Sequence, residues 1–178
     1  AFANTPVQKV QLPSTLTTIR YGAFQNCTAL KQITLPESMT FIEGGAFQNC
    51  SALSSILVPQ NVTYLGASAF SGCTSLTSAT LPQAITRISS GLFENCSSLD
   101  MVVSGNGLET IGSDAFAGCD SLTGVEVPDS VTEIGDSAFG DNANLTLWCS
   151  ENGTAWQYAE TNGIMAEERI RRAVSVEV

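Results

Sequence analysis

The cysteines are the residues of this chain whose type and spacing could do chemistry. Five of the six recur at intervals of 23 residues: Cys27, Cys50, Cys73, Cys96 and Cys119. The sixth, Cys149, lies outside this series. A zinc site needs local pairs of ligands, usually supported by histidine, and the chain has no histidine. Column neighbours would lie close enough for disulfides, but they point the same way and five cannot all pair. The spacing favours small buried thiols and argues against a metal site.

The lack of histidine also limits catalysis, because neither a Ser-His nor a Cys-His nucleophile pair can be assembled. Carboxylate pairs remain formally open, with Asp114, Glu133 and Asp136 as candidates. These acids fall on a repetitive surface without an obvious deep pocket, so solvated surface charge is the favoured interpretation. No glycine-rich phosphate loop is present. The sequence predicts no enzyme, no catalytic residue and no cofactor.

The 23-residue interval also governs the apolar residues. Its clearest column is aromatic: Phe24, Phe47, Phe70, Phe93, Phe116 and Phe139. Leucine, isoleucine and alanine columns keep the same interval. One repeat of this size cannot cover its own apolar residues, so neighbouring repeats are expected to stack and to bury identical columns against one another. The sequence therefore predicts an elongated solenoid.

Within one repeat, residues 30–36 alternate as a short strand does. Ile33 and Leu35 are expected to face the interior, and Gln32 and Thr34 to face outward. Equivalent strands of successive repeats would pair in parallel, about 4.8 Å apart. The Gly-Ala-Phe-Gln-Asn-Cys stretch on the other side is too short for an isolated helix, and we interpret it as one helical or 3₁₀ turn. The predicted class is α/β, with a parallel sheet on one face and short turns on the other.

The repeat unit resembles that of the BspA-like leucine-rich repeat proteins, roughly Ala-Phe-x-x-Cys-x-x-Leu-x-x-Ile-x-Leu-Pro-x-x-Val-x-x-Ile. Residues 13–148 follow this pattern. The resemblance implies a right-handed horseshoe or gently curved solenoid. It also implies a place on or outside a cell, with a bacterial one favoured, and a role in adhesion or protein binding.

The period divides the chain into four segments. They are a partial N-terminal repeat over 1–12, six 23-residue repeats over 13–150, a C-terminal cap over 151–166, and a tail or linker over 167–178. The chain begins within a coil and without an export signal, as a fragment or a processed form would. An edge strand is the alternative for the last segment.

The C-terminal segment departs from the period. Trp148 takes the inward strand position of the last repeat when positions are counted by the repeat interval. Thr154 is the expected N-cap of a cap helix and Gly163 its C-terminal stop. Trp156 and Ala159 are spaced to press one helix face onto the last coil.

Charge is unevenly distributed. The net charge is −10, with 15 acids and three arginines after residue 90 and a small positive excess before it. An acidic chain argues against a nucleic-acid or anionic-membrane partner, and no apolar run is long enough for membrane insertion. The charge asymmetry could steer a basic partner to the C-terminal coils. The alternative is that the acids only keep the repeat array soluble.

The outward side chains of the strands are the predicted partner-binding residues, because packing does not constrain them. They are Gln32, Thr34, Ser55, Leu57, Ser78, Thr80, Met101, Val103 and Glu126. Leu57, Met101 and Val103 are expected to form an apolar cluster among small polar residues, as partner sites often do. The alternative is that a neighbouring molecule or segment covers this cluster. Phe41 and Tyr64 are neighbours in a further column and are secondary contact candidates.

The sequence thus predicts a non-catalytic protein-protein interaction or adhesion module of a secreted or cell-surface protein. The expected partner is a protein, with host matrix or surface proteins as candidates. The alternative is a structural spacer repeat within a larger surface protein. The extracellular location is implied by the family resemblance.

Overall fold

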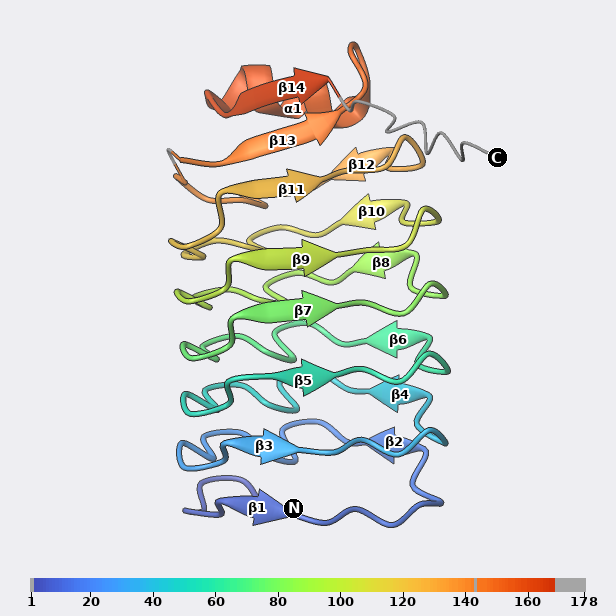
Figure 1. The fold of residues 1–178 in the computed structure, drawn as a ribbon, viewed down its shortest axis with the longest axis vertical. Coiled ribbons are helices and arrows are strands. Elements are labelled where there is room, and N and C mark those ends of the chain that lie inside the picture. The colour runs from blue at the N-terminus through green and yellow to red at the C-terminus, as the bar shows by residue number, and fades with distance from the viewer. Residues whose placement is uncertain (1, 143, 169–178) are drawn as a thin grey trace, which may run out of the picture.

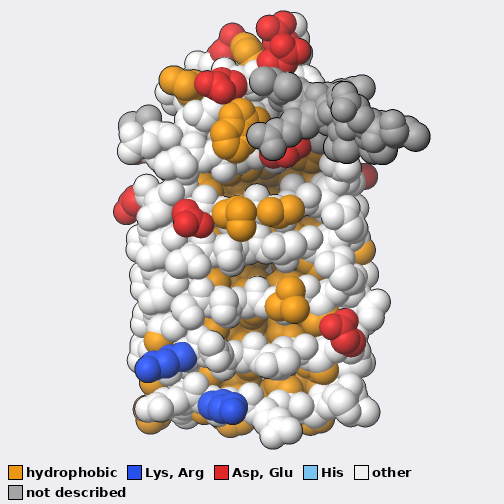
Figure 2. Space-filling model, in the orientation of Figure 1, with side chains coloured by type: hydrophobic (Ala, Val, Ile, Leu, Met, Phe, Trp, Pro, Cys, Tyr) orange, Lys and Arg blue, Asp and Glu red, His pale blue; other side chains and the backbone are white. Residues whose placement is uncertain are grey.

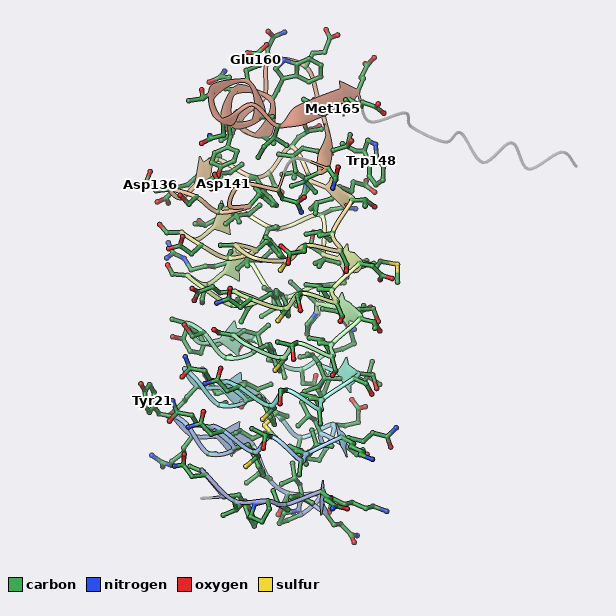
Figure 3. The ribbon with its side chains drawn as sticks, turned by 90° about the vertical axis from the view of Figure 1, so that its left-hand side faces the viewer. Tyr21, Asp136, Asp141, Trp148, Glu160 and Met165 are labelled. Atoms are coloured by element: carbon green, nitrogen blue, oxygen red, sulfur yellow. The ribbon has the colours of Figure 1, made fainter. Side chains whose placement is uncertain are left out.

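The structure is a computed structural model that describes residues 2–142 and 144–168. The chain winds as a right-handed solenoid whose coils stack into a nearly straight column, not a horseshoe (Figures 1 and 3). Each coil contributes a strand to a ladder that faces the viewer in Figure 1. The strands of this ladder are β1 (Lys9–Val10), β3 (Gln32–Ile33), β5 (Ile56–Leu57), β7 (Ser78–Thr80), β9 (Met101–Val103), β11 (Gly124–Glu126), β13 (Thr146–Cys149) and β14 (Met165–Glu168). We call its outer surface the strand face.

Pairing along the strand face is parallel, as predicted. The hydrogen-bonded groups are β1-β3, β5-β7-β9 and β11-β13-β14. Between β7 and β9, Ser78 pairs with Met101 and Ala79 with Val102, so equivalent residues of successive coils lie side by side. The predicted alternation is confirmed, because Ile33 and Leu35 are buried while Gln32 and Thr34 are exposed.

A second parallel ladder lies on the opposite side of the solenoid, which the sequence interpretation missed. Its strands are β2 (Thr18–Ile19), β4 (Phe41–Ile42), β6 (Tyr64–Leu65), β8 (Arg87–Ile88), β10 (Thr110–Ile111) and β12 (Glu133–Ile134). They pair as β2-β4-β6 and β8-β10-β12. Each holds an isoleucine or leucine inward and its preceding residue outward, so the isoleucine column belongs to a ladder as well as to the core. We call this surface the opposite ladder.

The phenylalanine column is buried in the core along its whole length, from Phe24 to Phe139. Neighbouring rings from Phe24 to Phe139 stack with centroids 5.3–5.7 Å apart. Phe2 extends the stack by one ring, 5.3 Å from Phe24. Offset stacking of this kind adds to the free energy gained by burying the rings. Each coil is therefore held to the next by its aromatic ring as well as by backbone hydrogen bonds.

The segments between the ladders are turns closed by hydrogen bonds between residues three apart, the bonding of the 3₁₀ alternative, and they form no regular helix. Gln25 N donates to the Gly22 carbonyl at 3.0 Å, and Cys27 N donates to the Phe24 carbonyl at 3.1 Å. Gly22 and Asn26 have φ near +60°, which bends the chain away from a right-handed helix. The turns still join coil to coil, because Phe24 N donates to the Ala46 carbonyl at 2.8 Å.

A single helix, α1 (Thr154–Asn162), covers the C-terminal end of the described column. Gly163 ends it in the left-handed conformation, as predicted, but the N-cap is Gly153 and not Thr154, which is the first helical residue. Ala155 and Ala159 are its buried residues. Ala159 therefore packs as expected.

Trp156 is half-buried and packs against the core together with Ala159, as predicted. Tyr158 makes an edge-on contact with Phe139, with ring centroids 5.8 Å apart, so the helix continues the aromatic stack. The Trp156 indole N–H donates to Glu160 at 3.1 Å. Beyond the helix, β14 pairs in parallel with β13. The tail expected over 167–178 therefore begins within a strand at Glu167 and Glu168, and its remainder lies outside the described residues.

The last coil is one residue shorter than the others, so the predicted inward position of Trp148 is wrong. Glu126 pairs with Trp148 and not with Cys149, which the repeat interval of the preceding coils would have placed beside it. Leu147 and Cys149 are buried, so strand alternation turns Trp148 outward. Gly140 takes the left-handed conformation one position earlier than Gly118 does in the previous coil, and the register changes after it. The interior position counted for Trp148 is filled by Leu147.

Candidate protein-binding face

All nine predicted partner-binding residues lie on the strand face, in two columns. Gln32, Ser55, Ser78 and Met101 form the first, and Thr34, Leu57, Thr80, Val103 and Glu126 form the second. Ser78 is half-buried and the other eight are exposed. The structure thus gathers these side chains on one surface. Their role in binding stays a prediction.

The apolar members of this surface are well exposed. Leu57 is 73% exposed, Met101 52% and Val103 44%. Met101 and Val103 are adjacent on β9, whereas Leu57 lies two strands away on β5, with Thr80 between it and Val103. Exposed aliphatic side chains on a flat, hydrogen-bonded surface carry an unfavourable hydration free energy that a partner could remove. Figure 2 shows separate apolar patches along this face of the column.

Trp148 and Met165 extend the exposed apolar surface toward the cap, and sequence reasoning missed both. Trp148 is 43% exposed and Met165 lies on β14, in the strand next to it. Figure 3 shows Trp148 projecting from the strand face, on the side of the solenoid away from Tyr21 and Asp136. A usable signal was the alternation of Leu145, Leu147 and Cys149, which places Trp148 outward whatever the repeat length.

The Trp148 ring lies against a glycine, Gly124, on the neighbouring strand β11. A Cβ atom on Gly124 would collide with the six-membered ring of the Trp148 indole. Gly124 occupies the position that Met101 has one coil earlier. The missing side chain therefore makes room for the indole to lie along the strand face.

Charge differs between the two ends of the strand face. Lys9 and Lys31 are exposed at its N-terminal end, where Figure 2 shows basic side chains. Toward the cap the acids predominate, and Trp148 stands in register between Glu126 on β11 and Glu167 on β14. The uneven charge of the sequence is therefore also present along the strand face.

The secondary candidates lie on the opposite ladder. The Phe41 and Tyr64 rings are both exposed, with centroids 6.2 Å apart and planes tilted by 45°. Tyr21 follows β2, is exposed and lies against Gly44. These aromatic residues and the strand-face residues lie on different sides of the solenoid, so one flat partner cannot contact both.

The cysteine column belongs to the core. All six cysteines are free and buried. The Cys50 thiol donates to the Phe24 carbonyl at 3.1 Å, and Cys96 does the same to Phe70 at 3.1 Å. Burial raises the pKa of Cys50 and of Cys96 to about 12. Such thiols are protonated at neutral pH and are therefore poor nucleophiles and poor metal ligands.

The acids considered for catalysis remain on the surface. Asp114, Glu133 and Asp136 are exposed, and a shallow hollow beside Asp114 is lined by two further acids, Asp120 and Asp141. Within residues 2–142 and 144–168, no three His, Cys, Asp or Glu side chains are grouped so that they could hold a metal ion. No helix of the described chain is long and apolar enough to cross a membrane.

Parallel ladders, a stacked phenylalanine column and short coils define a leucine-rich repeat solenoid, a fold that generally serves as a non-enzymatic scaffold. Residues 1–104 and 92–152 match the BspA type leucine rich repeat region, in six copies. The chain belongs to this family. Among curated proteins, none matches it.

Solved structures of similar fold come from several organisms. A leucine rich cell surface protein of Faecalibacterium prausnitzii is 36% identical over 79% of this chain, with a TM-score of 0.74. The leucine rich repeat protein of T. pallidum is 29% identical over 94% of this chain and 76% of its own, also with a TM-score of 0.74. A leucine-rich repeat protein of Eubacterium ventriosum is 27% identical, with a TM-score of 0.61. This chain spans 38% of the Faecalibacterium structure and 48% of the Eubacterium structure.

Proposed function

We propose that this chain is a protein-binding, adhesive module of a bacterial cell-surface or secreted protein, and that it binds through the strand face. The observation that carries the proposal is the exposure of three apolar side chains on that face, at Leu57, Met101 and Val103. The underlying ladder fixes their spacing, so little conformational entropy is lost when a partner docks. The surface location is carried over from the Faecalibacterium protein, which is described as a cell surface protein.

The test is binding to a panel of purified host matrix proteins, measured by surface plasmon resonance. A triple variant, with Leu57, Met101 and Val103 each replaced by serine, removes the apolar surface without altering an inward residue. A matched double variant, Phe41→Ser with Tyr64→Ser, removes exposed apolar area from the opposite ladder. We expect the first to weaken binding about tenfold or more and the second to leave the affinity unchanged.

If the strand-face variant binds every detected partner as the unsubstituted chain does, the proposed face is wrong. Loss of affinity only in the Phe41 and Tyr64 variant would mean that the partner binds to the opposite ladder. Both variants keep the buried columns, so an unchanged urea midpoint is the control for folding.

A spacer role is the second candidate, because this chain spans only 38% of the Faecalibacterium structure that it resembles. In this role the repeats would hold another part of a longer protein away from the cell. Insertion of two further 23-residue repeats should then leave activity of the whole protein intact. Retained activity with the serine-substituted strand face would favour the spacer over the binding module.

A further inference from the structure

We propose that Asn106 is a site of spontaneous deamidation in the folded chain, where the backbone of Gly107 converts the side-chain amide into a carboxylate. The inference goes beyond the proposed function and does not depend on it. It derives from the surroundings of the three Asn-Gly pairs of the chain, at 106–107, 152–153 and 162–163. The structure leaves the first pair unrestrained and holds the other two.

The reaction takes place within the pair and consumes one water. The backbone nitrogen of Gly107 loses its proton and attacks the side-chain carbonyl carbon of Asn106, so that a C–N bond forms, the bond to the side-chain nitrogen breaks and ammonia leaves. Water then opens the five-membered imide at either carbonyl, which gives aspartate or isoaspartate. The net change is from amide and water to carboxylate and ammonium. Glycine favours the attack because its backbone is flexible and carries no Cβ.

The pair at 106–107 lies in an exposed turn that follows β9. Leu108 N donates to the Gly105 carbonyl at 3.3 Å, which closes the turn. Asn106 and Gly107 are both exposed, and a Cβ on Gly107 would meet no atom within 4 Å. The next coil holds the backbone carbonyl of Asn106, which accepts from Ser130 Oγ at 2.8 Å. Among the described residues, neither the Asn106 side-chain amide nor the Gly107 N–H makes a hydrogen bond, so no bond must break before the attack.

The other two pairs are held at the groups that would react. The Gly153 N–H donates to the Ser150 carbonyl at 3.2 Å. The Gly163 N–H donates to the Ala159 carbonyl, and the side-chain amide of Asn162 donates to the backbone carbonyl four residues earlier at 2.8 Å. Each nitrogen can attack only after its bond opens, and one such bond slows the reaction roughly twofold to tenfold.

The new carboxylate would lie at the edge of the strand face. Asn106 and Val103 line the same shallow hollow of about 130 Å³. Position 106 corresponds to Asp129 in the next coil, 23 residues later, where the Val131 N–H and the Pro128 carbonyl close the same turn. An aspartate therefore fits this turn, and it adds a negative charge beside Val103. The isoaspartate product instead lengthens the backbone of the turn by one methylene group.

The reaction is measured on the full chain, incubated in its folded state at mildly alkaline pH in water enriched in heavy oxygen. A glutamate-specific protease then separates the three pairs into peptides that each end at a glutamate: 95–109, 152–160 and 161–167. Because digestion takes place in ordinary water, heavy oxygen in a side chain marks conversion in the folded chain, and fragment masses assign it to one residue. We expect at least about fivefold more label at Asn106 than at Asn152 or Asn162.

Two controls separate the effect of the structure from that of the sequence. In urea that unfolds the chain, all three pairs lose their surroundings, so the preference for Asn106 should disappear. Gly107→Ala places a Cβ in open space, so the fold should be kept, as an unchanged circular dichroism spectrum would verify. The label at Asn106 should then be largely lost, because the attacking nitrogen belongs to an obstructed and less flexible residue.

The inference is overturned by equal label at the three pairs of the folded chain, by the absence of label at Asn106, or by a preference that persists in urea. Reaction of Gly107→Ala at the rate of the unsubstituted chain would also refute it. No partner is present in this experiment, so its failure leaves the proposed function standing. Failure of the Leu57, Met101 and Val103 variant to weaken binding likewise leaves the deamidation site standing.

Discussion

The substitution Phe93→Ala tests whether the aromatic stack holds the coils together. Phe93 is 0% exposed, and its ring centroid lies 5.7 Å from those of both Phe70 and Phe116. Burial of a phenylalanine side chain contributes about 1.5–3 kcal/mol, and an aromatic pair adds about 0.5–1.5 kcal/mol. With two such pairs and a cavity left behind, we expect a loss of about 4 kcal/mol in the free energy of unfolding.

Phe2→Ala is the matched control from the same stack. Phe2 is 43% exposed and has one stacking partner, Phe24, so we expect a loss of only about 1–2 kcal/mol. Both values come from urea denaturation followed by far-ultraviolet circular dichroism. The prediction is contradicted if Phe93→Ala costs less than about 2 kcal/mol, or no more than Phe2→Ala.

The same experiment tests coupling between coils. Stability in a repeat array arises from neighbouring interfaces, so a cavity in the middle weakens the link between the two ends. Both tryptophans, Trp148 and Trp156, lie near the C-terminal end, and their fluorescence reports that end alone. In Phe93→Ala the fluorescence and dichroism midpoints should separate, whereas in the unsubstituted chain they should coincide.

Three further predictions concern single sites. Burial raises the pKa of Cys50 and Cys96 from 9.0 to about 12, so their contribution to stability is complete below pH 9 and is lost as the pH rises toward 12, because the unfolded chain then releases its thiol protons first. The urea midpoints at pH 7 and pH 10.5 should therefore differ less in the Cys50→Ala, Cys96→Ala double variant than in the unsubstituted chain. An equal difference in both proteins would contradict this. Gly124→Ala should displace the indole of Trp148 and shift its fluorescence emission to the red. The free energy of unfolding should change by less than about 1 kcal/mol, because the ring is the movable end of an exposed side chain. An unchanged spectrum would refute the contact between this ring and Gly124. Tyr158→Phe should change the free energy of unfolding by less than about 1 kcal/mol relative to the unsubstituted chain, because the buried hydroxyl has no hydrogen-bond partner among the described residues. A loss above about 2 kcal/mol would mean that the Tyr158 hydroxyl is hydrogen-bonded.

Much of the fold could be predicted because the period and the strand alternation are both imposed by burial. Phe24 and its successors recur at a constant interval since each must meet the same ring of the next coil, and Ile33 and Leu35 are separated by an outward residue for the same reason. The outward placement of Leu57 followed directly from that alternation. These features depend on side-chain volume and hydrophobicity, which the sequence states explicitly.

The parts that could not be predicted depend on backbone geometry. The turns at Gly22 and Asn26 rely on left-handed residues, and a short apolar segment does not distinguish such turns from a helical one. The position of Trp148 was wrong because the last coil is one residue shorter, so counting by the repeat interval conflicted with local alternation, and alternation prevailed through the burial of Leu147. The pairing of Trp148 with Glu126 could be recognised only after this register was known.

The partner-binding role of the strand face is tested most directly by hydroxyl-radical footprinting of the chain alone and in complex with a matrix protein that it binds. Met101 and Trp148 are exposed on the strand face, Tyr21 is exposed on the other side, and Met39 is buried. The account predicts that the partner protects Met101 and Trp148 from oxidation while Tyr21 reacts as before and Met39 stays unreactive. Protection of Tyr21 with undiminished oxidation of Met101 and Trp148 would contradict it.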